Sequence, residues 1–442
     1  MTPDEDGRGA SADDLQRRRA ATAREALALI RPALPADRSV DLRLAGDGRA
    51  EPGARAHVVV GGPDALARLL WPISADAFGE ACLRGDIEIE GDFGAAIDAG
   101  RALDAKVLAG AAPRIARLGL ELRRGAGSAP VLERRARLTG RRHSRARDMA
   151  AIRFHYDVGN EFYATWLDSR LVYSCAYFET PDTSLDAAQE AKLDLVCRKL
   201  RLGPGTRLLD IGCGWGSLVF HAAERYGAEA TGITLSAAQA DWAAKQIRQR
   251  QLEARAVVAV RDYRDLRRMG SFDAVASVGM FEHVGRDRLE AYFRSAFAAL
   301  RPGGLFLNHG IATTDTRGRS WLRRVRPGDG GFLGHYVFPD GELVTVEVAI
   351  AVARRCGFEL VDVQSLRPHY ALTLAAWVER LESHADAARA LAGEEVFRTW
   401  RLYMTAARRG FEEGSLDVAQ ILLARPSPAG PAVLPLRPWW TK

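Results

Sequence analysis

A glycine-rich loop between a predicted buried strand and a predicted helix is the feature that most constrains the fold of this chain. Residues 206–211 (TRLLDI) form an apolar run typical of a buried strand, and this run leads directly into residues 212–216 (GCGWG). A helix is predicted over 217–226, ended by Gly227. Glycines permit a tight turn and let a ligand approach the amino terminus of a helix. The arrangement predicts a ligand at the carboxyl end of a strand in a parallel α/β sheet.

The spacing of the glycines narrows the kind of ligand. The loop reads GxGxG, whereas the dinucleotide fingerprint is GxGxxG, and the acidic Asp210 stands just before it. A compact loop of this kind suits an adenosyl-amino acid better than a pyrophosphate. A purely structural turn is the alternative, because one glycine loop alone is weak evidence.

The segments after the loop repeat the same pattern. Strands are predicted over 228–236, 254–260 and 271–284, and polar or small residues stand at the end of each. A further helix over 288–300 leads through an RPGG turn into another strand. Because the carboxyl ends of parallel strands meet at one edge of a sheet, this convergence favours a binding site over a structural turn.

Composition and predicted secondary structure divide the chain into four segments. We expect a disordered segment over 1–15, a small α+β domain over 16–100, a basic helical connector over 101–150, and an α/β domain over 151–442. No run of about 18 apolar residues predicts a transmembrane helix, and the acidic, polar start is not a secretory signal. The five cysteines are scattered without a CxxC pair, so we expect a cytoplasmic protein with neither a disulfide framework nor a metal site.

The net charge of +6 hides an uneven distribution. Residues 1–100 carry 12 basic and 18 acidic side chains, whereas residues 101–147 carry 13 basic and 3 acidic ones. The second block predicts contact with anionic lipid headgroups, at about 1 kcal/mol per basic side chain. A solvated linker is the alternative, and aromatic residues do not alternate with the arginines, which disfavours nucleic acid. The densest arginines are Arg134, Arg135, Arg137, Arg141, Arg142, Arg145 and Arg147.

An ordered set of motifs from about residue 150 to 425 resembles the cyclopropane-fatty-acyl-phospholipid synthase family, relatives of the mycolic acid cyclopropane synthases. The resemblance implies a class I methyltransferase fold that uses S-adenosylmethionine (SAM), preceded here by the small α+β domain. It also implies methyl transfer to the cis double bond of a phospholipid acyl chain, at an anionic membrane surface on the inner side. A homodimer is implied by resemblance alone. The motifs are FHYDVGNEFYATWLDSRLVYSCAYF, LLDIGCGWGSL, GITLSAAQ, RDYRDL, SVGMFEHVG, HGI, HYVFPDGEL and HYALTLAAWVERL.

Two groups of site residues follow from the resemblance, position by position. The first group would bind SAM: Tyr173 and Ser174, then Asp210, Gly212 and Gly214 at the methionine part, Thr234, Leu235, Ser236 and Gln239 near the ribose, and Asp262 and Tyr263 near the adenine. The second group would bind a bicarbonate ion beside the reacting carbon: Cys175, Glu282, His309, Ile311 and Tyr370.

The chemistry explains why such residues are needed. A plain alkene is a weak nucleophile, and methyl transfer from the sulfonium of SAM leaves a carbocation on the chain. A base must then remove a proton from the added methyl group so that the ring closes, while water is excluded. Glu282 and His309 would orient bicarbonate as that base, and Tyr370 would donate a hydrogen bond. Because Glu282 repels an anion unless one partner carries a proton, shared protons are expected.

Several alternatives stay open. The same cation gives a methylene- or methyl-branched chain if it loses a different proton. Methyl transfer to a small soluble amine or phenol is a second alternative, and a lipid-binding module with a vestigial SAM fold is a third. Family members carry a cysteine four residues before a phenylalanine, where this chain has Ala407 before Phe411; a carbocation mechanism does not need it. A basic loop with Arg317, Arg319, Arg323, Arg324 and Arg326 would contact lipid phosphates. We also expect Gly212→Val to abolish SAM binding without unfolding the protein.

Overall fold

The chain folds into two units. A computed structural model describes residues 12–37, 39–48, 51–71, 74–314 and 331–441. The first unit comprises 1–134 and 394–406, and the second comprises 135–393 and 407–442. The predicted basic loop with Arg317 to Arg326 lies outside the described residues.

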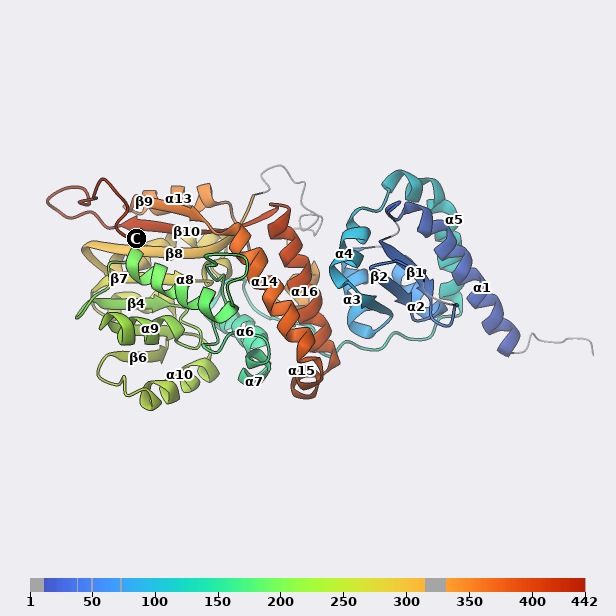
Figure 1. Cartoon of the computed structure of the whole chain (residues 1–442), viewed down its shortest axis with the longest axis horizontal. Helices are drawn as coiled ribbons and strands as arrows, with labels where there is room; N and C mark the ends of the chain where they lie inside the picture. Colours follow the sequence, from blue (N-terminus) through green and yellow to red (C-terminus); the bar gives the residue numbers. More distant parts are fainter. Residues whose placement is uncertain (1–11, 38, 49–50, 72–73, 315–330, 442) are drawn as a thin grey trace, which may run out of the picture. The chain divides into compact units, whose positions relative to one another are not determined.

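The first unit contains a three-stranded sheet among its described residues, in the order β1-β2-β3 (Figure 1). β1 and β2 are parallel, and β2 and β3 are antiparallel. Within residues 77–93 one strand, β3, follows α3, and β2 supplies its pairing partner. The elements are α1 (Ala12–Ile30), a 3₁₀ turn η1 (Arg31–Ala33), β1 (Val40–Leu44), β2 (Ala56–Val60), α2 (Pro63–Leu70), α3 (Ala75–Arg84), β3 (Ile87–Gly91), α4 (Phe93–Arg101) and α5 (Ala105–Arg124).

Helix α5 belongs to the core of the first unit. Its basic side chains cover one face, while Ile115, Leu118 and Leu122 are buried against α1 and α2. Asp104 begins the helix by accepting hydrogen bonds from two backbone amides of the first turn. The predicted connector over 101–150 therefore differs from the structure. An apolar stripe of helical spacing lies among the arginines and packs in the core.

The second unit contains a seven-stranded sheet among its described residues, in the order β6-β5-β4-β7-β8-β10-β9. β4 to β8 are parallel, and β10 runs antiparallel to both of its neighbours. The elements up to the third strand are α6 (Arg145–Tyr156), α7 (Asn160–Ala164), α8 (Leu185–Lys199), β4 (Arg207–Ile211), α9 (Ser217–Tyr226), β5 (Glu229–Thr234), α10 (Ala237–Gln249), β6 (Ala256–Val260) and η2 (Tyr263–Arg268).

The remaining elements of the chain complete the sheet and its helical cover. They are β7 (Phe272–Val278), η3 (Phe281–His283), η4 (Arg286–Arg288), α11 (Leu289–Ala299), β8 (Leu300–Thr313), α12 (Gly331–Tyr336), α13 (Val346–Arg355), β9 (Glu359–Ser365), α14 (Arg367–Ser383), α15 (Ala385–Ala392), α16 (Glu394–Glu412) and β10 (Leu416–Ala424). Helix α16 contributes residues to both units. The doubly wound α/β class predicted from the sequence is confirmed.

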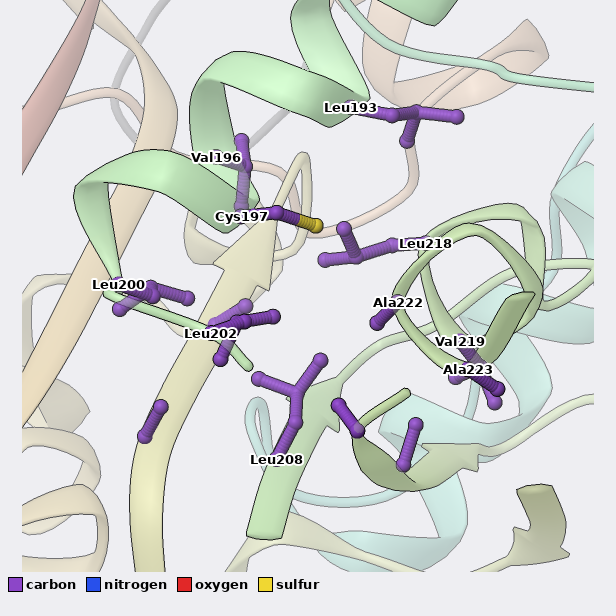
Figure 2. Packing of buried hydrophobic residues seen from close by; sticks show 14 of the residues in the cluster. Leu193, Val196, Cys197, Leu200, Leu202, Leu208, Leu218, Val219, Ala222 and Ala223 are labelled. Atoms are coloured by element: carbon purple, nitrogen blue, oxygen red, sulfur yellow. The ribbon is translucent and has the colours of Figure 1, made fainter. Parts of the chain in front are cut away.

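Helices bury both faces of this sheet. On one face, α8 and α9 pack over β4, as Figure 2 shows for Val196, Leu208 and Leu218. On the other face, α11 and α13 cover the alternate residues of the same strands. Because both faces are covered, a ligand reaches the sheet only at its edges and at the ends of its strands.

Candidate active site

A cleft opens at the carboxyl ends of the central strands. It consists of two adjoining hollows. The first is lined from β4 and α8, and the second from the ends of β5 and β6. The two hollows share Tyr156, Gly212, Gly214, Gln239 and Gly279. One elongated ligand can therefore span both.

The glycine loop forms the floor where the hollows meet. Gly212 and Gly214 have φ angles of +79° and +54°, a region that favours glycine. A Cβ atom on Gly212 would lie 2.7 Å from Met280 Cβ and Cγ, whereas one on Gly214 would meet nothing within 4 Å. Gly212 thus accommodates the protein's own Met280. Gly212→Val would press its side chain against Met280 and is expected to strain the fold, whereas open space lies at Gly214.

Asp210 ends β4 beside the loop. Its carboxyl group is buried, and among the described residues its Oδ1 atom has no hydrogen-bond partner. Burial raises the pKa of this carboxyl to about 7, although the nearby Lys192 lowers it. A buried oxygen without a partner in the wall of a cleft is a binding group for a ligand donor.

Tyr173 and Ser174 line the first hollow, as predicted, and a buried lysine lies beside them. Lys192 of α8 is 1% exposed, and its Nζ donates a 2.9 Å hydrogen bond to Ser174 Oγ. Two lining residues, Lys192 and Tyr156, are not among those predicted from the sequence. The sequence signal for Lys192 is a cation among the apolar positions of the helix over 185–199, a pattern that it shares with the buried Lys199.

The segment that follows β5 places the side-chain amide of Gln239 at the cleft. Thr234 Oγ1 donates to Gln239 Oε1 at 2.8 Å, and Gln239 Nε2 has no partner among the described residues. Ser236 begins α10, because its hydroxyl accepts from the backbone of Gln239. Leu235 lines the second hollow. Of the four predicted residues, Thr234, Leu235 and Gln239 line the second hollow, whereas Ser236 lines neither hollow and holds the backbone of Gln239.

The end of β6 departs from the expectation for Asp262. Both carboxylate oxygens of Asp262 accept from the guanidinium of Arg264, at 2.7 and 2.6 Å. Tyr263 and Arg264 line the second hollow, whereas Asp262 is not among its lining residues. The structure therefore places Tyr263 at the cleft and uses Asp262 to hold Arg264 there.

Glu282 lies on the 3₁₀ turn η3, beyond β7, and not at a strand end as the sequence suggested. Its Oε1 atom accepts a 2.6 Å hydrogen bond from the backbone amide of Ile311, while Oε2 has no partner among the described residues. Burial raises the pKa of this carboxyl to about 7, and the Ile311 amide lowers it. Glu282 is thus fixed in position and able to carry a proton near neutral pH.

His309 lies inside β8, because the pairing of β8 with β10 continues past it to Thr313. Its Nδ1 atom is 3.3 Å from Gln420 Nε2, and its Nε2 atom has no partner among the described residues. Burial keeps the pKa of the imidazole well below its ordinary value, so the ring is neutral. Gln420 was not predicted, since β10 reaches His309 from the far end of the chain.

Hydrogen bonds to the backbone of Leu366 connect Cys175 and Tyr370 to strands β10 and β8. The thiol of Cys175 donates to the backbone carbonyls of Ala176 and Leu366, at 3.3 and 3.7 Å. Burial raises the pKa of this thiol, which therefore stays neutral. The backbone amide of Tyr370 donates to the Leu366 carbonyl, and the Leu366 amide donates to Val418, which pairs with Ile311. The Tyr370 ring packs on Phe411, with centroids 4.7 Å apart.

The five residues predicted for bicarbonate are separate from the cleft lining. None of the five lines either hollow in the part of the chain that the structure describes. The link is the backbone of Gly279, a lining residue whose amide donates to the His309 carbonyl at 2.9 Å.

Most arginines of the basic block have partners inside the protein. Arg142 and Arg147 pair with Asp340, and Arg145 pairs with Asp265. Arg134 lies over Trp400, and Arg135 lies beside His335. Arg137 and Arg141 are exposed, and neither has an ion-pair partner among the described residues. The number of arginines free to meet a lipid surface is therefore smaller than the sequence suggested.

Comparisons with known proteins show the family to which the chain belongs. The family model described as mycolic acid cyclopropane synthetase matches residues 143–421. A probable fatty acid methyltransferase of Pseudomonas putida is 41% identical over 391 residues, which cover 88% of this chain and 91% of that protein. Across the described residues, no helix combines the length and apolar character needed to cross a membrane.

Two solved structures are similar to about three fifths of the chain. The cyclopropane synthase MmaA2 of Mycobacterium tuberculosis has a TM-score of 0.60 at 35% identity, covering 63% of this chain and 98% of that one. The mycolic acid cyclopropane synthase CmaA1, solved in complex with SAH and CTAB, has a TM-score of 0.58 at 33% identity, with the same coverage. The chain belongs to the mycolic acid cyclopropane synthetase family and is a SAM-dependent methyltransferase.

Proposed function

We propose that the protein transfers the methyl group of SAM to the cis double bond of an unsaturated acyl chain in a membrane phospholipid, and that the product is a cyclopropane ring. The observation that carries the proposal is that two buried polar atoms, Glu282 Oε2 and His309 Nε2, have no partner among the described residues, while Gly279, whose amide donates to the His309 carbonyl, lines the cleft. The names of the relatives, a fatty acid methyltransferase and cyclopropane synthases, support an acyl chain as the acceptor.

The two atoms without partners fit a small oxyanion. Glu282 with a pKa of about 7 offers an O–H donor when it is protonated, and neutral His309 offers Nε2. Ile311 differs from the expectation, because its amide is already donated to Glu282. It acts by holding that carboxyl. Bicarbonate bound there would supply a base for the proton that leaves the transferred methyl group.

The chain's own residues then have separate tasks. Asp210 and Gln239 offer a free acceptor and a free donor to SAM in the cleft. As the sulfonium carbon–sulfur bond breaks and the new carbon–carbon bond forms, positive charge appears on the acyl chain. Half-buried aromatic rings that line the cleft, such as Tyr156 and Tyr173, would exclude water from that charge. Glu282 and His309 keep the base oriented until the proton is removed and the ring closes.

A branched or methylene product is the second candidate. It is favoured by one observation: a methoxy mycolic acid synthase, whose name does not denote a cyclopropane, is 34% identical over 293 residues. The protein residues needed for methyl transfer are the same in both cases, and only the proton that is lost differs.

The test of the base assembly compares Glu282→Gln with Glu342→Gln. The side chain of Glu342 accepts a hydrogen bond from the backbone amide of Arg286, and the Glu342 amide donates to the Glu282 carbonyl. Glu342 is therefore bonded to the same turn as Glu282, but it does not contact the unpartnered Oε2 atom. We expect Glu282→Gln to bind SAH normally and to turn over about 10²–10⁴-fold more slowly. Glu342→Gln should keep the wild-type rate.

Bicarbonate itself is tested in degassed buffer. The wild-type rate should fall on degassing and recover when bicarbonate is added, whereas Glu282→Gln should respond little to either. A wild-type rate that ignores bicarbonate, together with a near-normal rate for Glu282→Gln, would remove the ion from the mechanism.

A further inference from the structure

Lys192 is a buried cation that the proposed reaction does not yet use. It projects from α8 into the wall of the first hollow, next to Asp210 and Ser174, and is 1% exposed. Burying an ammonium group is unfavourable unless an anion or several acceptors surround it. In the structure, Ser174 Oγ is its one hydrogen-bond acceptor among the described residues. Two of its three N–H donors are therefore available.

The carboxylates near Lys192 do not neutralise it by direct contact. Asp168 and Asp210 raise the pKa of Lys192, but desolvation is the larger effect and lowers this pKa to about 8. The carboxylate oxygens of Asp168 accept hydrogen bonds from the backbone amides of Val172 and Arg170. Within the described part of the chain, no carboxylate forms an ion pair with Lys192. An anionic group of a ligand would therefore stabilise the ammonium of Lys192 at this position.

The hydrogen bond from Lys192 also leaves the Ser174 hydroxyl as a second donor for a ligand. An ammonium group only donates, so Ser174 Oγ must accept from Lys192. The hydroxyl hydrogen of Ser174 is then free for another acceptor, and Ser174 borders the same hollow. An acceptor placed there would receive hydrogen bonds from both residues, and a negative charge would strengthen them.

SAM contains one anionic group, its α-carboxylate. The sulfonium and the α-ammonium are cationic, and the adenosine is neutral. We propose that Lys192, together with Ser174, binds the α-carboxylate of SAM, while Asp210 faces the α-ammonium. This inference rests on SAM as the co-substrate and adds the residue that recognises its amino-acid end.

The assignment also sets the direction of the ligand in the cleft. With the amino acid in the first hollow, the adenosine extends past Gly214 and Gln239, which line both hollows. It then reaches Tyr263 in the second hollow. Lys192 therefore determines which end of SAM enters which hollow.

Calorimetric titration with two ligands tests this inference. The ligands are SAH and its decarboxylated analogue, which keeps the ammonium and the adenosine but has no carboxylate. The variant is Lys192→Met. The matched control is Lys199→Met, which removes another fully buried lysine of α8 that pairs with Asp362 at 3.0 Å and lines neither hollow.

We expect wild type to bind SAH about 10- to 100-fold more tightly than the decarboxylated analogue, the range of a charge-assisted hydrogen bond. Lys192→Met should lose this preference by weakening SAH alone, and Lys199→Met should keep it. A merely structural role for Lys192 predicts that both ligands weaken equally, which would overturn the inference. Equal binding of the two ligands by wild type would overturn it without any variant.

Two further arms keep the test decisive. If circular dichroism shows that Lys192→Met does not fold, Lys192→Gln keeps an N–H donor while removing the charge, and it should lose most of the preference. Retention of the full preference by Lys192→Gln would contradict the inference. Failure of wild type to bind SAH at all would contradict the SAM site itself, which distinguishes that outcome from an error about Lys192 alone.

Discussion

Alanine at Gly212 and at Gly214 should give two opposite phenotypes, although the two glycines are two residues apart. Both have positive φ angles, +79° and +54°, so alanine at either position costs about 1–2 kcal/mol of backbone strain. At Gly212 the new methyl group would also lie 2.7 Å from Met280, and such overpacking costs a further 1–3 kcal/mol or so. Gly212→Ala should therefore lower the free energy of unfolding by about 2–5 kcal/mol, and Gly214→Ala by about 1–2 kcal/mol.

Binding should follow the reverse order. The methyl group on Gly214 meets no protein atom within 4 Å and stands where the two hollows join. A bound ligand would meet it, and we expect Gly214→Ala to lose about 1–3 kcal/mol of SAH affinity by steric overlap. The folded fraction of Gly212→Ala should bind SAH more nearly as wild type does.

Urea unfolding and calorimetric titration of the same three proteins measure both quantities. A midpoint of unfolding for Gly212→Ala equal to that of Gly214→Ala would refute the close contact with Met280. Wild-type SAH affinity in Gly214→Ala would refute the glycine loop as the floor of the ligand site.

Three further outcomes follow from the structure. Burial raises the pKa of Glu282 from 4.5 to about 7, so ionisation of this side chain destabilises the folded state progressively as pH rises through that window. The free energy of unfolding of Glu282→Gln, measured by urea unfolding, should therefore rise relative to that of wild type by up to about 3 kcal/mol between pH 5 and pH 8. An equal difference between the two proteins at both pH values would contradict the buried carboxylate. The double variant Arg137→Gln/Arg141→Gln should bind anionic vesicles more weakly than wild type at an unchanged melting temperature. Arg147→Gln should lower the melting temperature, because it breaks a part-buried ion pair with Asp340. Unchanged vesicle binding by the double variant would identify Arg137 and Arg141 as solvated side chains only. Tyr370→Phe should keep the melting temperature, since its ring packing is preserved, and should slow turnover; an unchanged rate would leave Tyr370 as a packing residue.

Local sequence was sufficient for the elements that depend on neighbours in the chain. The buried run before the loop became β4, and the helix over 217–226 begins and ends as predicted because Gly216 and Gly227 take left-handed conformations at its ends. Gly214, Gln239 and Tyr263 lie at the cleft for the same reason, since strand ends in a parallel sheet converge.

Features set by distant segments were not predictable in this way. The length of β8, and with it the place of His309, depends on pairing with β10, which follows about a hundred residues later. Gln420 reaches His309 only through that pairing. Lys192 was concealed because one lysine in a helix is ordinarily exposed, and only tertiary packing buries it.

The most direct test of the proposed function is the fate of the methyl group. The protein is incubated with SAM carrying a ¹³C-labelled methyl group and with vesicles of a cis-unsaturated anionic phospholipid, and the extracted lipid is analysed by proton and carbon NMR. The proposal predicts that the label appears in the acyl chain as a ring carbon, with ring protons far upfield. Label in a methylene or methyl branch would contradict ring closure while keeping acyl transfer. Label absent from the acyl chain would contradict the account as a whole.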